Sequence, residues 1–356
     1  MFKIDFKNKR VDFFRLATFA KKNNLNHKEC LMQAFNQNVL LEENVILLKN
    51  FINSFENIEQ INSQLYQDVF ASFIIGEKFE KTYLEFGATD GLNLSNSYLL
   101  ENSFNWRGVL SEPSPQWHEA LKKNRKNSDI ITKCIWKESG KRLEFFMSDQ
   151  GELSTLKDFV ESDKNSMPVN TKMRKESGKT ISVETISLND LVREYFNNIC
   201  PSYISIDTEG SEYEILKAFD LNKYRPKLFT IEHNFTENHT KLDELLISNG
   251  YVRIFRKLTA FDAWYIQLED LWVDKFNFSF RNREVTFHKL CLFAKKANLD
   301  PNECLIQAFN QNALIDDNRD ILKKFVHYLE NIEYFKFKLC SQIYQDIFAS
   351  FIIGDK

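Results

Sequence analysis

Short apolar runs that end in an acidic or small residue alternate with helical stretches through the middle of the chain. The runs are TYLEFG, RGVLSE, DIITKCI, YISIDT and KLFTIEH, at 82–87, 107–112, 129–135, 203–208 and 227–233. Helical patterns separate most of them, at 94–103, 114–126, 211–219 and 238–249. This alternation is typical of a parallel sheet covered by helices on both faces. We therefore expect an α/β fold whose last two runs, YVRIFRK and DAWYIQL, pair as antiparallel strands.

A near-repeat lies on both sides of this region. The segment SQLYQDVFASFIIGEK at 63–78 returns as SQIYQDIFASFIIGDK at 341–356, and AKKNNLNHKECLMQAFNQN at 20–38 returns as AKKANLDPNECLIQAFNQN at 294–312. The distance between copies far exceeds the roughly 20–50 residues of a solenoid unit, so the repeat has the scale of a domain. We expect one domain at 63–272. The last residues would be the lead-in of a second, truncated copy of it.

The repeated flanks have the pattern of helices. Phe13, Leu16, Phe19 and Ala20 recur near a 3.6-residue period, and Asn26 is a candidate N-cap for the next helix. We expect a helical module at 1–62 and a second one within 273–356. These modules carry no motif of chemical meaning, and we expect them to dock on the catalytic domain or to pair in a homo-oligomer.

A polar segment at 147–180 interrupts the alternation of strands and helices, and the sequence predicts a long loop there. Basic residues recur in its second half: Lys164, Lys172, Arg174, Lys175 and Lys179. One interpretation is a lid that meets a phosphorylated or otherwise anionic substrate. The other is a mobile, solvated loop.

The overall charge and the cysteines limit the possible partners and environment. The net charge is −3, so no global field favours nucleic acid or an acidic membrane surface. No apolar run approaches the ~20 residues of a transmembrane helix. The six cysteines show no metal-ligand spacing. We expect a cytoplasmic protein with reduced thiols, no membrane span and no nucleic-acid partner.

The first predicted strand runs into a glycine turn, GATDG, at Gly87–Gly91. Glycines allow a backbone to approach a ligand closely, but the third glycine of a dinucleotide fingerprint is missing. Glu85 and Asp90 also disfavour a pyrophosphate, which binds at helix-end N–H groups away from carboxylates. A cationic or amino-acid-like ligand suits this turn better, and an ordinary strand–helix turn is the alternative.

The other strands of the predicted sheet also end in acidic residues. Glu112, followed by Pro113, stands where a carboxylate accepts both hydroxyls of a ribose, although a solvated strand-end acid would look the same. The fourth strand ends at Asp207, with Glu209 and Glu212 close behind, and these two acids could simply favour the following helix N-terminus. The fifth strand ends in Glu232-His233-Asn234. Because the carboxyl ends of parallel strands meet at one edge, the sequence predicts a site there.

These motifs together resemble a known family. YLEFGATDGLNLSNSYLLE, WRGVLSEPSP, ISIDTEGSEYEILKAFD and TIEHN occur in the order found in the FkbM family of S-adenosylmethionine-dependent methyltransferases. SQLYQD at 63–68 resembles the lead-in of that family, usually SQ-x-G-Q-D, with Tyr66 in place of the glycine. The resemblance covers about 63–268. It implies a class I methyltransferase (Rossmann-like) fold, with a seven-stranded, mostly parallel sheet whose last strand is antiparallel.

The resemblance also implies the cofactor and the kind of reaction. S-adenosylmethionine would be held by residues of the lead-in and of the first two strand ends: Gln64, Gln67, Glu85, Gly87, Ala88, Asp90, Gly91, Glu112 and Pro113. Family members typically O-methylate hydroxyls, often on sugars. We expect an O-methyltransferase acting on a sugar of a nucleotide-sugar or of a surface polysaccharide.

A hydroxyl needs help to lose its proton before it attacks a methyl group. A positioned base contributes typically ~10²–10⁴-fold, and the candidates are Asp207 or His233, with Glu209 close by. The alternative is a divalent cation held by Asp207, Glu209 and Glu232. Three oxygen ligands would suit Mg²⁺ rather than Zn²⁺.

Other functions remain open at this point. A nucleic-acid amino-methyltransferase is disfavoured by the absence of a Pro-Pro-aromatic turn after the fourth strand, and a NAD-dependent enzyme by the missing glycine. The chain could also be a non-catalytic cofactor-binding or scaffolding protein whose helical repeats mediate docking.

Overall fold

The structure, a computed structural model, describes residues 4–7, 9–40, 42, 45–55, 58, 60–267 and 304. The chain divides into two units, Met1–Glu42 with Leu48–Leu271 and Glu43–Leu47 with Trp272–Lys356. All described residues except 45–47 and 304 belong to the first unit. The second helical module and the truncated lead-in predicted at 273–356 lie outside the described residues, apart from Cys304.

A mixed sheet of seven strands forms the centre of this unit. In chain order its members are β1 (Thr82–Phe86), β2 (Arg107–Ser111), β3 (Asp129–Ile131), β8 (Tyr203–Ile206), β9 (Leu228–Glu232), β10 (Tyr251–Ile254) and β11 (Asp262–Gln267). Their order across the sheet is β10-β11-β9-β8-β1-β2-β3, and β11 runs antiparallel to both of its neighbours. The other pairs are parallel. The strand order reverses between β1 and β8, which is where open α/β sheets bind ligands.

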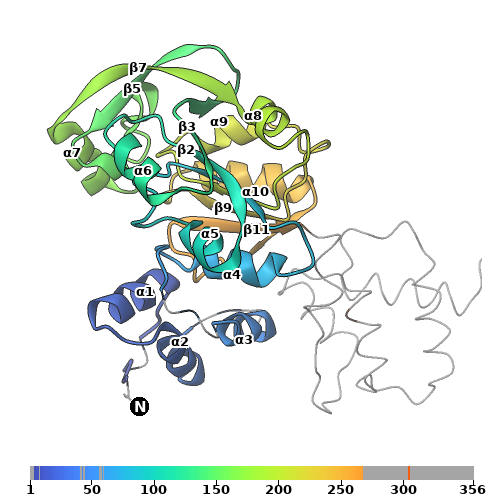
Figure 1. The fold of residues 1–356 in the computed structure, drawn as a ribbon. Coiled ribbons are helices and arrows are strands. Elements are labelled where there is room, and N and C mark those ends of the chain that lie inside the picture. Colours follow the sequence, from blue (N-terminus) through green and yellow to red (C-terminus); the bar gives the residue numbers. More distant parts are fainter. Residues whose placement is uncertain are drawn as a thin grey trace, which may run out of the picture. The chain divides into compact units, whose positions relative to one another are not determined.

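Helices cover both sides of this sheet (Figure 1). They are α4 (Gln67–Ile75), α5 (Tyr98–Phe104), α6 (His118–Asn124), α8 (Leu188–Tyr195), α9 (Glu212–Lys217) and α10 (Asn238–Ser248). Strands β1, β8 and β9 are buried along nearly their whole length, which is why they read as unbroken apolar runs. Leu191, Leu216 and Leu242 pack from the helices onto the same core. The predicted α/β fold is confirmed.

A second, smaller sheet interrupts the alternation between β3 and α8. It contains β4 (Cys134–Trp136), β5 (Arg142–Ser148), β6 (Thr155–Leu156) and β7 (Gly178–Ser187), in the order β4-β7-β5-β6. Helix α7 (Pro168–Glu176) and two 3₁₀ turns lie between β5 and β7. The loop predicted at 147–180 is therefore wrong, and the single strand predicted at 129–135 is divided between the two sheets.

The second sheet escaped prediction because only a few of its side chains are buried. Its apolar core is small, formed by Cys134, Phe145, Leu156 and Val183. Most other positions of β5 and the first half of β7 are exposed or half-buried, so neither strand shows the continuous apolar run of a parallel strand.

Three helices precede the sheet: α1 (Phe13–Lys22), α2 (His27–Asn36) and α3 (Val45–Asn53). The N-cap predicted at Asn26 is confirmed, because its Oδ1 accepts the Glu29 N–H at 2.9 Å. Phe13 is fully buried on the predicted face of α1, whereas Phe19 is 39% exposed. Phe19 lies six residues after Phe13, and at 3.6 residues per turn this separation places it on another side of the helix.

An aromatic cluster joins these helices to the sheet. Phe13 of α1 lies 5.7 Å from Trp264 of β11, and Phe51 of α3 lies 5.1 Å from Phe70 of α4, as measured between ring centroids. Phe70 and Trp264 lie 4.8 Å apart, and Phe255 contacts members from both groups. Edge-to-face and tilted aromatic pairs contribute about 0.5–1.5 kcal/mol each beyond the area they bury. Phe13, Phe51, Phe70 and Phe255 therefore help to dock α1 and α3 on the sheet.

Tyr66 occupies the position where the FkbM lead-in usually has glycine. Its φ is +71°, a left-handed conformation that favours glycine, so the backbone at this position would also suit the glycine that Tyr66 replaces. The ring is fully buried, with Phe13 and Phe55 edge-on to it, and its hydroxyl lies 3.1 Å from His27 Nδ1. These contacts offset the strain of the left-handed backbone.

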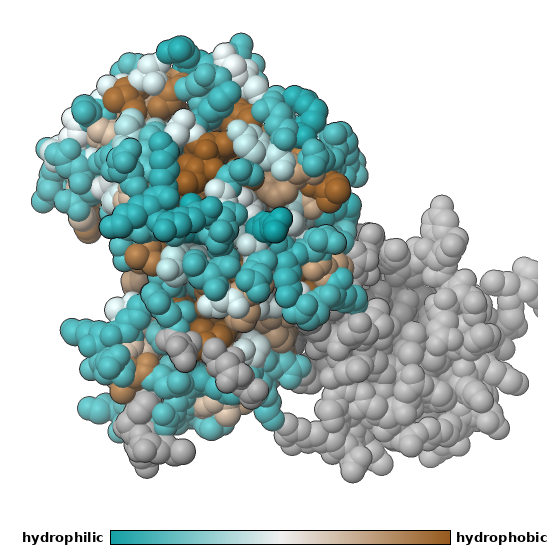
Figure 2. Space-filling view, in the orientation of Figure 1, coloured by the Kyte–Doolittle hydropathy of each residue, from teal (hydrophilic) through white to brown (hydrophobic). Residues whose placement is uncertain are grey.

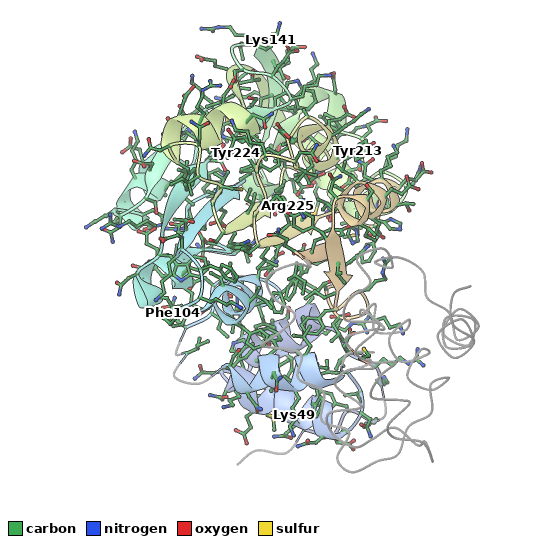
Figure 3. The ribbon with its side chains drawn as sticks, turned by 90° about the vertical axis from the view of Figure 1, so that its right-hand side faces the viewer. Lys49, Phe104, Lys141, Tyr213, Tyr224 and Arg225 are labelled. Carbon is green, nitrogen blue, oxygen red and sulfur yellow. The ribbon has the colours of Figure 1, made fainter. Side chains whose placement is uncertain are left out.

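The face shown in Figure 2 is mostly hydrophilic, with apolar patches between the polar groups. In the side view, Lys141 beside the second sheet and Lys49 on α3 lie at opposite ends of this unit, with the central sheet between them (Figure 3). None of the helices in the described part of the chain is long and apolar enough to span a membrane.

Candidate active site

A cavity of about 300 Å³ opens at the carboxyl ends of four strands. Glu85 on β1, Glu112 after β2, Asp207 after β8 and Glu232 at the end of β9 all line it. The topology brings these acids together, since parallel strands place their carboxyl ends on one edge of the sheet. The edge predicted from the sequence is therefore a real concave site in the described structure.

The turn after β1 is closely packed against β8. Gly87 has a φ of +69°, and a Cβ at this position would lie 2.1 Å from the Asp207 carbonyl oxygen. Gly87 and Ala88 donate their N–H groups to the Ser111 carbonyl, at 3.1 and 3.3 Å. Gly87, Ala88 and Thr89 line the cavity, so this turn brings backbone directly to any ligand there.

Two residues predicted to bind the cofactor build this turn instead. Asp90 and Gly91 do not line the cavity. Asp90 Oδ1 accepts the N–H groups of Leu92 and Asn93, at 2.9 and 2.8 Å. A Cβ on Gly91 would lie 2.6 Å from Cγ of Arg125, so this glycine allows a close approach inside the protein rather than to a ligand.

Glu85 is held by several donors at the bottom of the site. It is 3% exposed, and its Oε1 accepts the Asn96 N–H at 2.7 Å, while Oε2 accepts the hydroxyls of Ser95 and Ser97. Arg125, fully buried, lies 3.8 Å from Oε2. Asn96 Oδ1 is buried beside Glu85 and has no hydrogen-bond partner within the described residues. This oxygen can accept a bond from a ligand's ammonium group.

Glu112 has both carboxylate oxygens fixed by backbone groups. Oε2 accepts the Thr89 N–H at 2.9 Å and Oε1 accepts the Ser114 N–H at 2.8 Å. Burial nevertheless raises the pKa of Glu112 to about 7, with these two bonds opposing the rise. The remaining lone pairs lie at the cavity wall together with Pro113.

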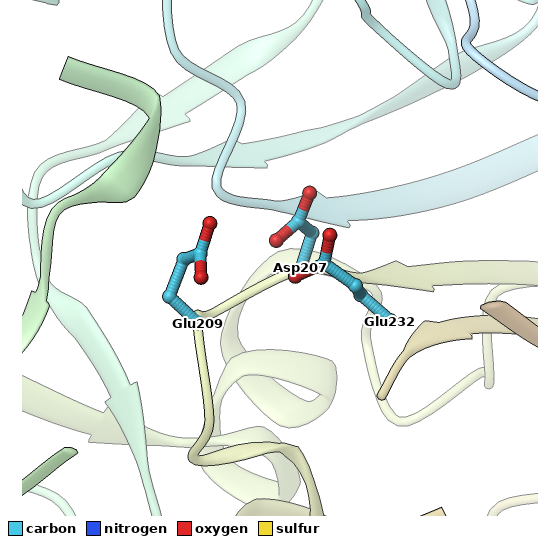
Figure 4. Close-up of side chains that lie close together, drawn as sticks. All are labelled: Asp207, Glu209 and Glu232. Carbon is cyan, nitrogen blue, oxygen red and sulfur yellow. The ribbon is translucent and has the colours of Figure 1, made fainter. Parts of the chain in front are cut away.

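Asp207, Glu209 and Glu232 form the acid trio of the site (Figure 4). One carboxylate oxygen from each lies within 4.8 Å of the others. Burial, with repulsion by Asp262 and Glu212, raises the pKa of Asp207 to about 7, although a hydrogen bond with Glu232 opposes the rise. Burial and mutual repulsion also raise the pKa of Glu209 and of Glu232 well above the ordinary value. The trio therefore retains protons at pH values where isolated carboxyls are ionised.

Strained backbone surrounds the trio. Thr89, Glu209 and Asn234 line the cavity and have φ values of +47°, +58° and +45°. Left-handed conformations of this kind cost about 1 kcal/mol or more for residues other than glycine, and they persist where neighbouring contacts fix them. The Asn234 side chain makes contacts of this kind, because its Nδ2 donates to Glu232 Oε2 at 2.7 Å and to Glu209 Oε2 at 3.3 Å.

Arg174, on α7, connects the second sheet's segment to the acid trio. It is fully buried, and its Nη2 donates to Glu209 Oε2 at 2.7 Å. Its Nη1 donates to Asp163 Oδ1 at 3.0 Å and to the Val160 carbonyl at 3.0 Å. The sequence offered no signal that separated Arg174 from the solvated basic residues around it. It does not act as part of a lid over an anionic substrate, because its guanidinium already pairs with two acids.

His233 shares the strand end but not the cavity. Its Nδ1 accepts the Phe235 N–H at 3.0 Å, and its Nε2 lies 3.1 Å from both the Asp262 carbonyl oxygen and Arg253 Nη2. Burial and the adjacent Arg253 lower the pKa of His233 to about 3. Both ring nitrogens are engaged, and neither is placed to take a proton from a ligand in the cavity.

Comparison with known families identifies the domain around this cavity. A sequence model described as the methyltransferase FkbM domain matches residues 85–253. Residues 85–253 therefore form an FkbM methyltransferase domain. A domain of this family implies S-adenosylmethionine as the methyl donor, and the match spans every strand end that lines the cavity.

Comparison with individual proteins adds no argument about the substrate. No curated protein matches the chain. Four chains of solved structures match, among them precorrin-6y C5,15-methyltransferase from Geobacter metallireducens GS-15. That structure is 12% identical, with 55% of this chain and 76% of that chain covered and a TM-score of 0.30.

The lead-in segment at 63–68, which precedes the FkbM match, also reaches the site. Gln64 and Gln67 line the cavity, and their contact with a cofactor stays a prediction. Gln67 is buried, its Nε2 donates to Asp262 Oδ2 at 2.9 Å, and its Oε1 accepts the Leu65 N–H at 2.8 Å. Gln67 thus connects the lead-in to β11. Asp262, whose pKa burial raises to about 6, is a further acid of the cavity that sequence reasoning missed.

Proposed function

We propose that this protein is an S-adenosylmethionine-dependent O-methyltransferase that acts on a hydroxyl group of a sugar. The observation that carries the proposal is the cavity at the strand switch point of an FkbM domain, with carboxylates on one side and a close glycine turn on the other. S-adenosylmethionine supplies an electrophilic methyl group on its sulfonium, and the hydroxyl oxygen displaces S-adenosylhomocysteine as the C–O bond forms and the C–S bond breaks.

The cofactor half of the site is proposed to lie between the turn after β1 and the end of β2. Asn96 Oδ1 and Glu85 would face the ammonium of the methionine part, because the first is a buried acceptor without a partner and the second is an ionisable acid beside it. Glu112 would accept the ribose hydroxyls with the lone pairs that its two backbone donors leave open. Gly87 and Ala88 would contact the donor through backbone, while Gln64 and Gln67 would close this half from the lead-in.

Asp207 is proposed as the general base. It lines the cavity at the end of β8, and its pKa of about 7 allows it to take a proton near neutral pH and release it again. Burial and repulsion by Asp262 and Glu212 account for that raised pKa, and a hydrogen bond with Glu232 opposes it. Alignment of donor and hydroxyl between the two halves of the cavity can supply about 7–11 kcal/mol of barrier lowering.

A divalent cation at the acid trio is a second candidate for activating the hydroxyl. Each acid offers one oxygen within 4.8 Å of the others, and Asn234 Oδ1 makes no hydrogen bond within the described residues. Two ligands on one Mg²⁺ lie at most about 4.2 Å apart, so the carboxylates would have to move together slightly. Dialysis against EDTA followed by Mg²⁺ titration tests this: unchanged activity would exclude the metal.

Titration calorimetry with S-adenosylmethionine and S-adenosylhomocysteine tests the proposal itself. We expect micromolar binding of both, weakened by Glu112→Gln. Glu119→Gln, on the exposed side of α6, is the matched control. Binding of neither compound would exclude the methyltransferase. Binding without transfer to any of a broad panel of hydroxyl compounds would favour a scaffolding protein that keeps the cofactor site.

The domain organisation is part of the proposal. We propose 63–272 as the methyltransferase domain and 1–62 as a helical module that docks on it through Phe13 and Phe51, whose rings contact the sheet. Pairing of such modules in a homo-oligomer is tested by light scattering of the intact chain.

A further inference from the structure

An aromatic pair from two distant parts of the chain lines the active-site cavity. Phe14 lies on α1 and Phe261 immediately precedes β11, and their ring centroids are 5.3 Å apart at an interplanar angle of 69°. Both line the cavity, and Phe14 is 39% exposed. The helical module therefore contributes a side chain to the site of the methyltransferase domain.

The position of Phe14 is determined by its neighbour. Phe13 is fully buried in the aromatic cluster, and its N–H donates to the Leu258 carbonyl at 2.9 Å. This bond and the ring contacts with Phe255 and Trp264 hold the start of α1 against the segment that leads into β11. Because adjacent helical residues point about 100° apart, burying Phe13 turns Phe14 outward to the cavity.

The charged groups of the cavity wall disfavour an anionic acceptor. No lysine, arginine or histidine among the described residues lines it, whereas Glu152 and Asp262 add to the four strand-end acids and Glu209. Within the 164–179 segment, Lys164 and Lys175 pair with Glu161 at the surface, and Arg174, which does not line the cavity, is paired with Glu209 and Asp163. A phosphate or carboxylate on the acceptor would meet acids and no cation.

Uncharged polar groups complete the wall on this side. Gln64, on the lead-in, makes no hydrogen bond within the described residues, and Asn170 on α7 also lines the cavity. Amides and carboxylates together suit a ligand with several hydroxyl groups, which donate and accept at once. An aromatic ring face, which carries negative partial charge, suits the C–H groups of a saturated ring.

We infer that the acceptor is a sugar ring or cyclic polyol without phosphate or carboxylate, and that it stacks on Phe14 and Phe261. The inference rests on the proposed function and departs from the nucleotide-linked sugar expected from the sequence. It assigns the helical module a role in acceptor binding. An amino sugar belongs to the same class, because an ammonium is compatible with both the acids and the aromatic rings.

The test compares Phe14→Ala with Phe19→Ala. Phe19 is on the same helix and equally exposed, at 39%, but does not line the cavity. The probes are methyl glycosides of common hexoses and 2-amino-hexoses, with the corresponding hexose 6-phosphates and uronic acids. Product formation is followed by S-adenosylhomocysteine release and by the mass gain of one methylene. Calorimetric binding of S-adenosylmethionine is measured for each variant.

We expect transfer to members of the uncharged or amino set and at least about tenfold lower kcat/KM for matched phosphates and uronates. Phe14→Ala and Phe261→Ala should raise the acceptor KM about 3- to 10-fold, as loss of an aromatic contact implies. Their affinity for S-adenosylmethionine should stay within twofold, and Phe19→Ala should match the parent protein. Preference for the anionic set, no transfer to the uncharged set, or equal KM values for Phe14→Ala and Phe19→Ala overturns the inference. If S-adenosylmethionine does not bind at all, the proposed function itself fails.

Discussion

Replacing Arg174 by methionine tests how the segment between β5 and β7 supports the acid trio. The change removes bonds to Glu209 Oε2 at 2.7 Å, to Asp163 Oδ1 at 3.0 Å and to the Leu153 and Val160 carbonyls at 2.8 and 3.0 Å. Both acids are almost fully buried, at 6% and 1% exposure, so each loses its positive partner in a site water hardly reaches. Breaking a buried pair in this way costs about 3–5 kcal/mol.

The expected result is a large fall in melting temperature. For a domain of this size, 1 kcal/mol shifts Tm by about 2–4 °C, so Arg174→Met should lower Tm by about 6–20 °C. Arg193→Met is the control, because Arg193 pairs with Asp190 at the same 2.7 Å but is 56% exposed. A surface pair contributes about 0–1 kcal/mol, so this variant should melt within about 4 °C of the parent protein.

The pH dependence of the stability lost in Arg174→Met gives a second, independent result. Burial raises the pKa of Glu209 well above its ordinary value, and Arg174 opposes that rise. Without Arg174 the folded protein holds this proton to still higher pH, while the unfolded chain releases it near its ordinary pKa. Stability falls as pH rises wherever the folded state binds more protons, so the deficit should be larger at pH 8 than at pH 5. Differential scanning calorimetry at both pH values measures it.

Two outcomes would refute this reasoning. A deficit no larger than that of Arg193→Met would show that the pair does not stabilise the fold. A deficit that shrinks as pH rises would show that Glu209 is not the group left uncompensated. The double variant Arg174→Met/Glu209→Gln should recover part of the lost stability, because it removes the buried carboxylate together with its partner.

Three further changes test other parts of the site. Asp207→Asn should lower kcat about 10²–10⁴-fold in steady-state kinetics, while its affinity for S-adenosylmethionine, measured by calorimetry, should stay within a few-fold of the parent protein. An unchanged kcat would exclude Asp207 as the base. The affinity for S-adenosylmethionine should fall up to about tenfold per pH unit below pH 7, because Glu112, with its pKa of about 7, must lose its proton to accept two hydroxyls; a flat calorimetric profile would contradict this. Phe13→Ala should cost about 3–5 kcal/mol in urea unfolding, since the ring is fully buried, and a loss below about 1 kcal/mol would contradict the docking of α1 on the sheet.

The parts of the site predicted from the sequence share one physical property. Strands β1, β2, β8 and β9 are buried on both faces, so they appear as apolar runs, and the acids at their ends meet wherever parallel strands are paired. Glu85, Glu112, Asp207 and Glu232 could be placed on one edge for that reason alone. Their placement on this edge does not depend on the direction of any side chain.

The parts that could not be predicted depend on side-chain direction and long-range packing. His233 stands on the predicted edge, but hydrogen bonds to Phe235 and Asp262 turn both of its ring nitrogens away from ligand. Gly91 has the spacing of a cofactor glycine, yet it makes room for the Arg125 side chain. Arg174 reaches Glu209 only because α7 folds back over the end of β8, and no local pattern encodes that contact.

The near-repeat allows the start of α1, including the cavity-lining Phe14, to be compared with a second copy in the same chain. Aligned with the first copy, the second copy has Phe287 where the first has the buried Phe13, and Leu290 where the first has Leu16. At the position of Phe14 it has His288 instead. Two of the buried positions that dock α1 are thus kept between the two copies, while the position proposed to contact the acceptor differs, as does buried Ala17, which aligns with Cys291. Apolar packing requires the same side chains whatever the substrate, whereas an acceptor-binding position changes with the ligand it meets. This difference between the copies is what a helical module with a role in acceptor choice predicts.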